Sequence, residues 1–290
     1  MAFKTVLCVT EVEHSDQDVR TAAGLCAEVG ARLSVLIIKF ATRPPISAVS
    51  ALWPEHTRDV VRLERRFREI EALSENIAKL EKRSREIRTL LEAGRAPYDV
   101  DTDYCDKGSV GHLLRHRAPY ADLTVIGPSL LDDEDLGPLA IDGSLVQSGK
   151  PVLVVPHGAK ASLRPRRILV GWDSRVETAR VVREALPLLC DAEDVRVTLL
   201  DPEAAGAENG PGPGTDIAGY FARHGIRVAV DRLPSDVQSL TTVLTQHAID
   251  TSAEMIVMGA CGHRRLRERI FGGVTRWIVE KPPLPLFVAR

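Results

Sequence analysis

The chain contains 290 residues, which is long for a single hydrophobic core and sufficient for two domains. Hydrophobic residues make up 44% and charged residues 27% of the sequence, as in an ordinary soluble globular protein. The formal net charge of −2 argues against general binding to nucleic acid or to a membrane surface.

The sequence gives no sign of a targeting segment, a zinc site or a disulfide framework. Its first residues lead directly into an expected strand without a signal-peptide pattern, and no apolar run approaches membrane-spanning length. The cysteines are scattered and include no Cys-x-x-Cys pair. We therefore expect a cytoplasmic protein. The five cysteines are Cys8, Cys26, Cys105, Cys190 and Cys261.

The chain reads as two copies of one plan, in which strands alternate with helices. Thr10 and Trp172 end matching first strands and are 162 positions apart, and Gly127 and Gly259 end matching late strands that are 132 positions apart. Alternation of this kind implies βαβ units, right-handed crossovers and a mostly parallel sheet. The paired segments are strands 4–10 and 167–172, helices 15–29 and 176–189, strands 33–38 and 195–200, and strands 124–127 and 256–259.

The difference between the two offsets predicts about thirty extra residues in the first copy, and these form a long amphipathic helix over 60–92 that ends before Gly94. Arginine and glutamate interleave between its apolar residues, which favours a solvated face over a basic binding surface. An exposed apolar strip predicts a homodimer or protein-partner surface. The apolar residues are Val60, Leu63, Phe67, Ile70, Leu73, Ile77, Leu80, Ile87 and Leu91.

Three segments read as loops or linkers. Residues 41–54 contain several prolines, 156–165 separates the two copies, and 201–215 is rich in glycine and proline. We therefore predict one domain over 1–157, with the long inserted helix, and a second over 166–290.

The stretch from Met255 to the end of the chain has the features of a nucleotide phosphate site. A short apolar strand ends on Gly259, Gly262 follows, and Gly272 opens a helix-like segment before a last strand over 285–289. Glycines let the backbone approach an anion closely, and free amides at a helix start favour negative charge. The pattern is neither a Walker-type loop nor a Rossmann fingerprint, because the required residues and spacing are absent.

The spacing Gly259-x2-Gly262-x9-Gly272 resembles the Gly-x2-Gly-x9-Gly-Ser/Thr signature of the ATP-binding branch of the universal stress protein family. This sequence departs from the signature at Gly273, where the family has Ser or Thr. The backbone amide would remain there, and Thr275 lies nearby in the sequence. The alternative is a glycine-rich turn with a helix cap and no ligand.

The resemblance implies an α/β fold of two tandem domains, each a five-stranded mostly parallel sheet flanked by helices. The family's last strand pairs across a dimer, so segments 151–155 and 285–289 would pair within this chain as an internal pseudo-dimer. The implied function is binding of ATP, or of AMP or ADP, in a stress response, with magnesium as a further candidate ligand. The implied nucleoside contact is Asp173, which is also suited to cap the following helix.

Other candidate contacts follow from position around this expected site. Leu200 would offer apolar contact to a base, and His263, Arg264 and Arg265 would counter phosphate charge, although these arginines also fit a solvated helix face. The complete candidate nucleotide-binding set is Trp172, Asp173, Leu200, Met258, Gly259, Gly262, His263, Arg264, Arg265, Gly272, Gly273, Val274 and Thr275.

The first copy looks like an eroded relative of this site. Leu130 stands where the second glycine belongs, and the acidic run 132–135 falls where phosphates would sit, although Gly143 and Ser144 resemble the final pair of the motif. We expect the acidic run to be a solvated loop rather than a magnesium site.

No catalytic motif is recognisable. The sequence lacks a nucleophile elbow, a His-rich metal motif and a carboxylate pair singled out by context, and Cys261 is better explained as a small turn residue than as a redox-sensitive thiol. We therefore do not predict an enzyme, or at most a weak ATPase. The alternatives are a nucleotide-independent interaction scaffold that uses the long helix, or a slow ATP hydrolase.

Overall fold

The computed structural model describes residues 3–41, 55–200, 214–234, 240–260 and 282–290. Its strands form one ten-stranded sheet of order β3-β2-β1-β4-β5-β10-β9-β6-β7-β8 within these residues. The strands are β1 (Thr5–Glu11), β2 (Arg32–Phe40), β3 (Tyr98–Cys105), β4 (Leu123–Ile126), β5 (Val152–Val154), β6 (Arg167–Trp172), β7 (Asp194–Leu200), β8 (Val228–Leu233), β9 (Met255–Gly259) and β10 (Leu286–Ala289).

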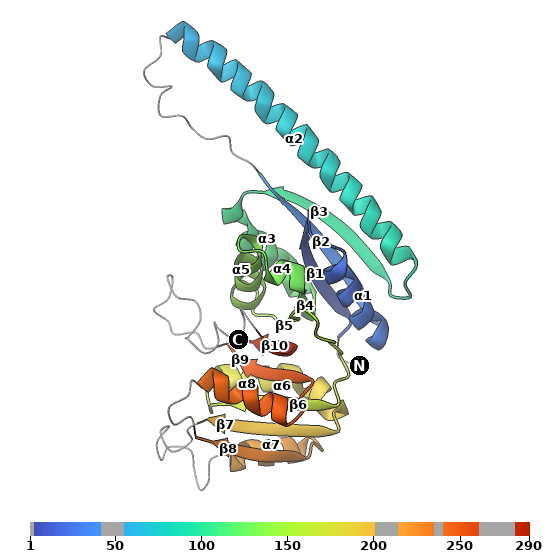
Figure 1. The fold of residues 1–290 in the computed structure, drawn as a ribbon, viewed down its shortest axis with the longest axis vertical. Coiled ribbons are helices and arrows are strands. Elements are labelled where there is room, and N and C mark those ends of the chain that lie inside the picture. Colours follow the sequence, from blue (N-terminus) through green and yellow to red (C-terminus); the bar gives the residue numbers. More distant parts are fainter. Residues whose placement is uncertain (1–2, 42–54, 201–213, 235–239, 261–281) are drawn as a thin grey trace.

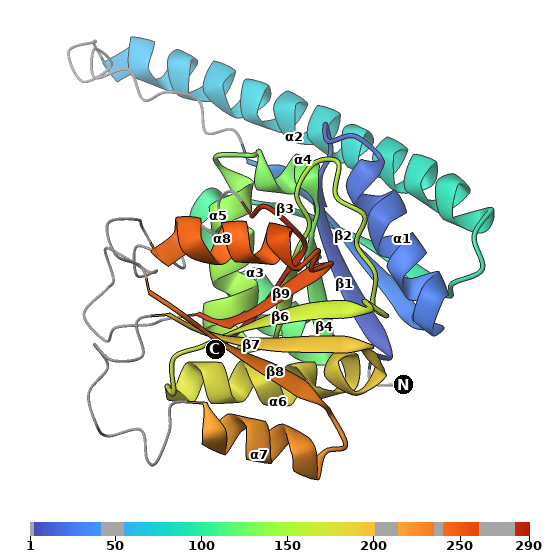
Figure 2. The same cartoon turned by 60° about the horizontal axis from the view of Figure 1, so that its bottom comes forward.

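Helices cover both faces of the sheet, and two hydrophobic clusters lie between the layers (Figure 2). One face carries α1 (Gln17–Val29), α2 (Glu55–Glu92), α6 (Val176–Asp191) and α7 (Thr215–Arg223). The other face carries α3 (Val110–Arg117), α4 (Pro128–Leu131), α5 (Leu136–Ile141), η4 (Asp142–Gln147) and α8 (Leu240–Asp250), and the short turns η2 (Lys107–Ser109) and η3 (Ala118–Tyr120) flank α3.

The sheet consists of two five-stranded parallel halves that run in mirrored order. The order β3-β2-β1-β4-β5 in the first half corresponds to β8-β7-β6-β9-β10 in the second. The only antiparallel neighbours in the described sheet are β5 and β10, where Phe287 lies opposite Leu153. The predicted α/β fold and the pairing of the two last strands within one chain are confirmed. The domain boundaries at 157 and 166 remain a prediction.

The central strands form because their side chains are apolar on both faces. In β1, Val6 and Cys8 enter one cluster, whereas Leu7 and Val9 enter the other. Parallel strands that are covered on both faces have this nearly continuous apolar character. Burying one such side chain contributes about 1.5–3 kcal/mol.

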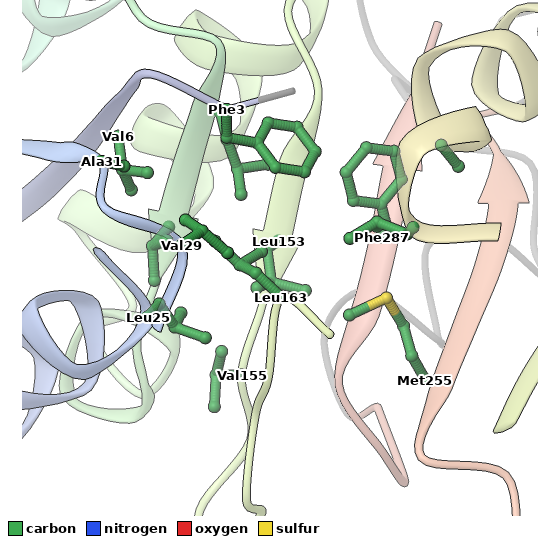
Figure 3. Packing of buried hydrophobic residues seen from close by; sticks show 14 of the residues in the cluster. Phe3, Val6, Leu25, Val29, Ala31, Leu153, Val155, Leu163, Met255 and Phe287 are labelled. Carbon is green, nitrogen blue, oxygen red and sulfur yellow. The ribbon is translucent and has the colours of Figure 1, made fainter. Parts of the chain in front are cut away.

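The two halves also share a core at their junction. The rings of Phe3 and Phe287 have centroids 6.3 Å apart, and Leu163 of the connecting segment packs in the same cluster (Figure 3). Val29 from α1 and Met255 from β9 belong to that cluster as well. Apolar burial and backbone pairing therefore both hold the two halves together.

The inserted helix is a single element, α2, and begins five residues before the expected start at 60. Leu80, Ile87 and Leu91 of its carboxyl-terminal part are buried against the sheet, next to β2 and β3. Its amino-terminal part extends beyond the edge of the sheet (Figure 1). The expected loop over 41–54 lies, apart from its first residue, outside the described residues. Among the described residues, no helix has the length and apolar character needed to cross a membrane.

Candidate functional site

The topology of the second half brings the ends of β6 and β9 together. These strands are parallel neighbours, with Val170 opposite Val257. The chain leaves β6 through α6 on one face of the sheet and enters β9 from α8 on the other face. Ligands of open α/β sheets bind outside the carboxyl ends of strands at such a switch point. Asp173, which follows β6, and Gly259, which ends β9, therefore occupy neighbouring strand ends.

Asp173 holds the turn that leads into α6. Its Oδ1 accepts hydrogen bonds from the amide of Arg175, at 3.0 Å, and from the hydroxyl of Thr178. Ser174 between them has a φ of 61°, in the left-handed region that few non-glycine residues adopt. Arg175 is the N-cap residue of α6 and no side-chain oxygen accepts a capping hydrogen bond there, so Asp173 braces the turn before the helix and does not cap it. Its Oδ2 lies 3.7 Å from Arg175 Nε, and 40% of its side chain remains exposed. The nucleoside contact stays a prediction.

Gly259 has a packing reason to be glycine that does not involve a ligand. A Cβ atom at this position would lie 2.7 Å from the amide nitrogen of Thr178 and 2.8 Å from the carbonyl carbon of Glu177. These are backbone atoms of the first turn of α6, so they can move away only if the helix shifts. The end of β9 and the start of α6 therefore pack in direct backbone contact. The sequence analysis did not single out Thr178, because its burial at the start of α6 is visible only in the structure.

The structure places only part of the candidate set. Trp172 packs, partly buried, against the cluster on the α6 side of the sheet, whereas Met258 is buried in the cluster on the α8 side, so they do not line a common surface. Leu200 ends β7, and its side chain is outside the described part of the structure. Gly262, His263, Arg264, Arg265, Gly272, Gly273, Val274 and Thr275, together with Cys261, also lie outside the described residues.

The corresponding strand ends of the first half are occupied by the protein's own carboxylate. Asp18, on the first turn of α1, is fully buried. Its Oδ1 accepts the amide hydrogen of Ser129 at 2.9 Å, and its Oδ2 accepts that of Leu130 at 2.8 Å. A Cβ atom on Gly127 would lie 2.5 Å from the carboxyl carbon of Asp18. The amides that begin α4 are those that a phosphate would use after a glycine turn, and here an internal anion satisfies them.

Further ion pairs lie at and after the end of β1 in the same half. The Lys39 ammonium lies 2.9 Å from a carboxylate oxygen of Glu11 and 2.9 Å from one of Glu13. Burial alone would lower the pKa of Lys39, but the hydrogen bonds to Glu13 and Glu11 outweigh it and raise that pKa. His14 Nε2 lies 2.9 Å from Asp133 Oδ2, and both side chains are mostly buried. The strand ends of the first half are thus closed by paired side chains.

The acidic run 132–135 is an exposed loop, as expected, apart from Asp133, which is partly buried. Asp133 pairs with His14 and also accepts the amide hydrogens of Asp135 and Leu136, at 2.8 and 2.9 Å. Asp132 lies 2.7 Å from His157, and Asp135 lies 2.6 Å from Lys107. Burial raises the pKa of Asp133, but the Leu136 and Asp135 amides and His14 overcome that effect and lower it. The run is therefore anchored in place, although Asp132 and Asp135 remain well exposed.

Gly143 and Ser144, which resembled the final pair of the motif, are both buried in η4. A Cβ atom on Gly143 would lie 2.8 Å from Cβ of Leu114, so this glycine allows η4 to pack closely against α3. Among the described residues, no group of three or more His, Cys, Asp or Glu side chains is arranged to hold a metal ion.

Known proteins resemble the chain in two ways. Residues 165–290 match the sequence model of the Universal stress protein family. A universal stress protein from Archaeoglobus fulgidus DSM 4304 shares 17% identity and a TM-score of 0.61 over 98% of both chains. A putative universal stress protein from Pseudomonas aeruginosa UCBPP-PA14 shares 15% identity and a TM-score of 0.56, covering 99% of this chain and 93% of that one. No curated protein matches the sequence.

At these identities the solved structures show a shared fold and do not by themselves show a shared activity. The match in sequence covers the half that contains β6 to β10, and the match in fold covers both halves. In sequence the carboxyl-terminal half is thus similar to the universal stress protein family, and in fold the whole chain is similar to these two structures.

Proposed function

We propose that this chain is a universal stress protein that binds one adenine nucleotide, ATP or else AMP or ADP, and acts in a stress response. The site lies in the carboxyl-terminal half. The observation that supports it is the placement of Asp173 and Gly259 at the ends of the adjacent strands β6 and β9, where the direction of the chain switches. The remaining glycines of the motif follow Gly259 directly in the sequence.

The contrast between the two halves supports a single site. Beside Gly127 lies the buried carboxylate of Asp18, which would repel a phosphate group. Beside Gly259 lies the uncharged backbone of Glu177 and Thr178. A negatively charged ligand would therefore meet a buried like charge in the first half and not at the corresponding place in the second.

In this proposal the phosphates are bound mainly by backbone amides around Gly262 and Gly272. His263, Arg264 and Arg265 supply positive charge, and magnesium accompanies the phosphates. Asp173 accepts hydrogen bonds from the nucleoside hydroxyls through the part of its carboxylate that is exposed. Binding through amides at glycines needs little side-chain chemistry, which suits a protein that senses or stores a nucleotide. A slow ATP hydrolase is the alternative for the same site, and phosphate release above background would show it.

Calorimetric titration of the nucleotide-stripped protein with magnesium ATP tests the proposal. We expect saturation at one nucleotide per chain. Gly262→Val should abolish binding and leave the circular dichroism spectrum unchanged. Gly24→Ala is the matched control, because a Cβ atom there meets nothing within 4 Å. Binding of two nucleotides would contradict the closed first half, and no heat from a folded protein at millimolar ligand would exclude the proposed function.

A second candidate function is self-association through α2. Ile70, Leu73 and Ile77 are 60%, 40% and 43% exposed on the part of this helix that approaches the edge of the sheet. Spacings of three and four residues are those of a helix–helix seam, and the sequence continues them toward Val60. We propose that this strip pairs with α2 of a second copy. Each side chain that becomes fully buried would contribute about 1.5–3 kcal/mol.

Light scattering tests whether the protein self-associates through α2. A dimer that becomes monomeric in the double variant Ile70→Gln, Ile77→Gln would support it. Ile249→Gln is the control, because Ile249 is equally apolar and 54% exposed on α8. The pairing would be refuted if the wild-type protein stayed monomeric at every concentration up to its solubility limit.

A further inference from the structure

The surface of α3 carries two histidines one helical turn apart, His112 and His116. Their ring centroids lie 4.4 Å apart, with the ring planes at 73°. Both residues are exposed. Their mutual ring contact is the one interaction recorded for either side chain in the part of the chain that the structure describes. Among the described residues, neither ring forms a hydrogen bond or an ion pair that would compete with a ligand from solvent.

We propose that His112 and His116 together chelate one divalent transition-metal ion of the copper, nickel and zinc class, and that water fills the remaining coordination positions. Neutral imidazole is a preferred ligand of these ions. Histidines at positions i and i+4 of a helix point from one face and can reach the same ion, as in helical zinc sites. The inference is independent of the proposed nucleotide site, which lies in the other half.

The helix that carries the pair is held firmly in place. Val110 and Leu114 are fully buried beneath α3, and Gly111 packs against the side chain of Gln147 from η4. The backbone positions of the two histidines are thus fixed, and their rings already lie in contact on the exposed side of the helix. Metal–nitrogen bonds of about 2.0–2.1 Å require only that the two rings turn their nitrogens toward a common point.

The local charges decide which ions can bind. Arg115 and Arg117 lie on the same helix, and only Arg117 has a carboxylate partner recorded in the described structure, Asp101. A positive neighbour disfavours ions held by charge alone, such as magnesium and calcium, which also prefer oxygen ligands. The carbonyl end of the helix offsets part of this repulsion near His116. Affinity should therefore follow ligand type and increase from zinc to copper.

The test is a calorimetric titration of the untagged, metal-stripped full chain with copper(II), zinc and magnesium chlorides. We expect one copper ion per chain, weaker binding of zinc, and no binding of magnesium. His112→Gln and His116→Gln should each weaken copper binding by at least about tenfold, since loss of a metal-site partner typically has an effect of this size. His157→Gln is the matched control, because His157 is also exposed but pairs with Asp132.

Paramagnetic resonance of the copper-loaded protein gives a second readout. The wild-type spectrum should show nitrogen ligands that disappear in the double variant His112→Gln, His116→Gln, while circular dichroism confirms that the variant is folded. A double variant that binds copper as tightly as the wild type, with the same spectrum, would place the ion elsewhere and overturn the proposal. Equal affinity for magnesium would also overturn it.

Discussion

The carboxylate of Asp18 lies 2.8 Å from the amide nitrogen of Leu130, although 112 positions separate them in the sequence. This bond ties the first turn of α1 to the first turn of α4, across the ends of β1 and β4. Together with the bond to Ser129, it gives the first half an internal anion at the place where the second half is proposed to bind an external one.

Removing this anion should destabilise the protein. Asp18→Ala leaves the buried amide of Leu130 and the partly buried amide of Ser129 without an acceptor, and a buried group of this kind costs about 1–3 kcal/mol. Urea denaturation should therefore show a loss of roughly 2–5 kcal/mol. Asp132→Ala removes an exposed carboxylate of the same region and should change stability by less than about 1 kcal/mol. Equal stability of the two variants would show that Asp18 does not hold α4.

Two glycine substitutions should change the stability of the protein in opposite directions. Gly259→Ala forces a methyl group against the backbone of Glu177 and Thr178 and should lower stability by about 1–3 kcal/mol. Gly24→Ala places a methyl group in open space within α1 and should raise stability by about 0.5–1 kcal/mol. Differential scanning calorimetry would measure both. A neutral Gly259→Ala variant would mean that β9 and α6 do not pack as closely as the structure shows.

The role of Asp173 in the turn before α6 can be tested separately from its proposed contact with the ligand. Asp173→Asn keeps an oxygen that can accept the amide hydrogen of Arg175, so the turn before α6 should persist. The change removes the negative charge, and hydrogen bonds to charged groups are worth about 1.5–3 kcal/mol. Nucleotide affinity should therefore fall by roughly tenfold or more while the unfolding midpoint barely moves. A variant with unchanged affinity would leave Asp173 with its role in the turn before α6 alone.

The hydrogen bonds that Asp133 accepts from the amides of Leu136 and Asp135, together with its pairing with His14, should appear in the acid stability of the protein. The pKa of Asp133 is lowered from its ordinary value of 3.8 in the folded state. A depressed pKa contributes stability that is present above the ordinary value and is lost as the pH falls through the folded-state value. Stability should therefore decline below pH 4, and Asp133→Asn should make that decline shallower. An identical slope in this variant, measured by urea denaturation between pH 5 and 2.5, would contradict the assignment.

The fold was predictable where buried strands have recognisable apolar runs in the sequence. Strands such as β1 and β9 are covered on both faces and therefore read as uninterrupted apolar runs. The edge strand β3 instead alternates Asp99, Asp101 and Asp103 with other residues, a charged pattern that protects edges but conceals the strand. The alternation has the period of two that is typical of a strand, but it brings only one fully apolar side chain, Val100, into the core.

The site was less predictable because its decisive contacts join distant segments. Asp18 follows a polar turn and looks like an exposed residue at a helix start, and nothing local indicates that its partners are the amides of Ser129 and Leu130. The predicted strand that ends on Gly259 is confirmed, since Gly259 is the last residue of β9. The glycine motif did not indicate that this glycine is also required for packing.

The antiparallel pair β5–β10 has a consequence for how the sequences of the two halves can evolve. Two identical chains that paired along such strands would form a dimer only above a certain concentration. Every substitution would then be present in both subunits. A covalent connection makes the encounter intramolecular, with an effective concentration on the order of millimolar, and guarantees that each assembly contains one copy of each half. The first half can therefore hold its own carboxylate, Asp18, at the strand ends without the same change occurring in the second half, because the two halves have separate sequences.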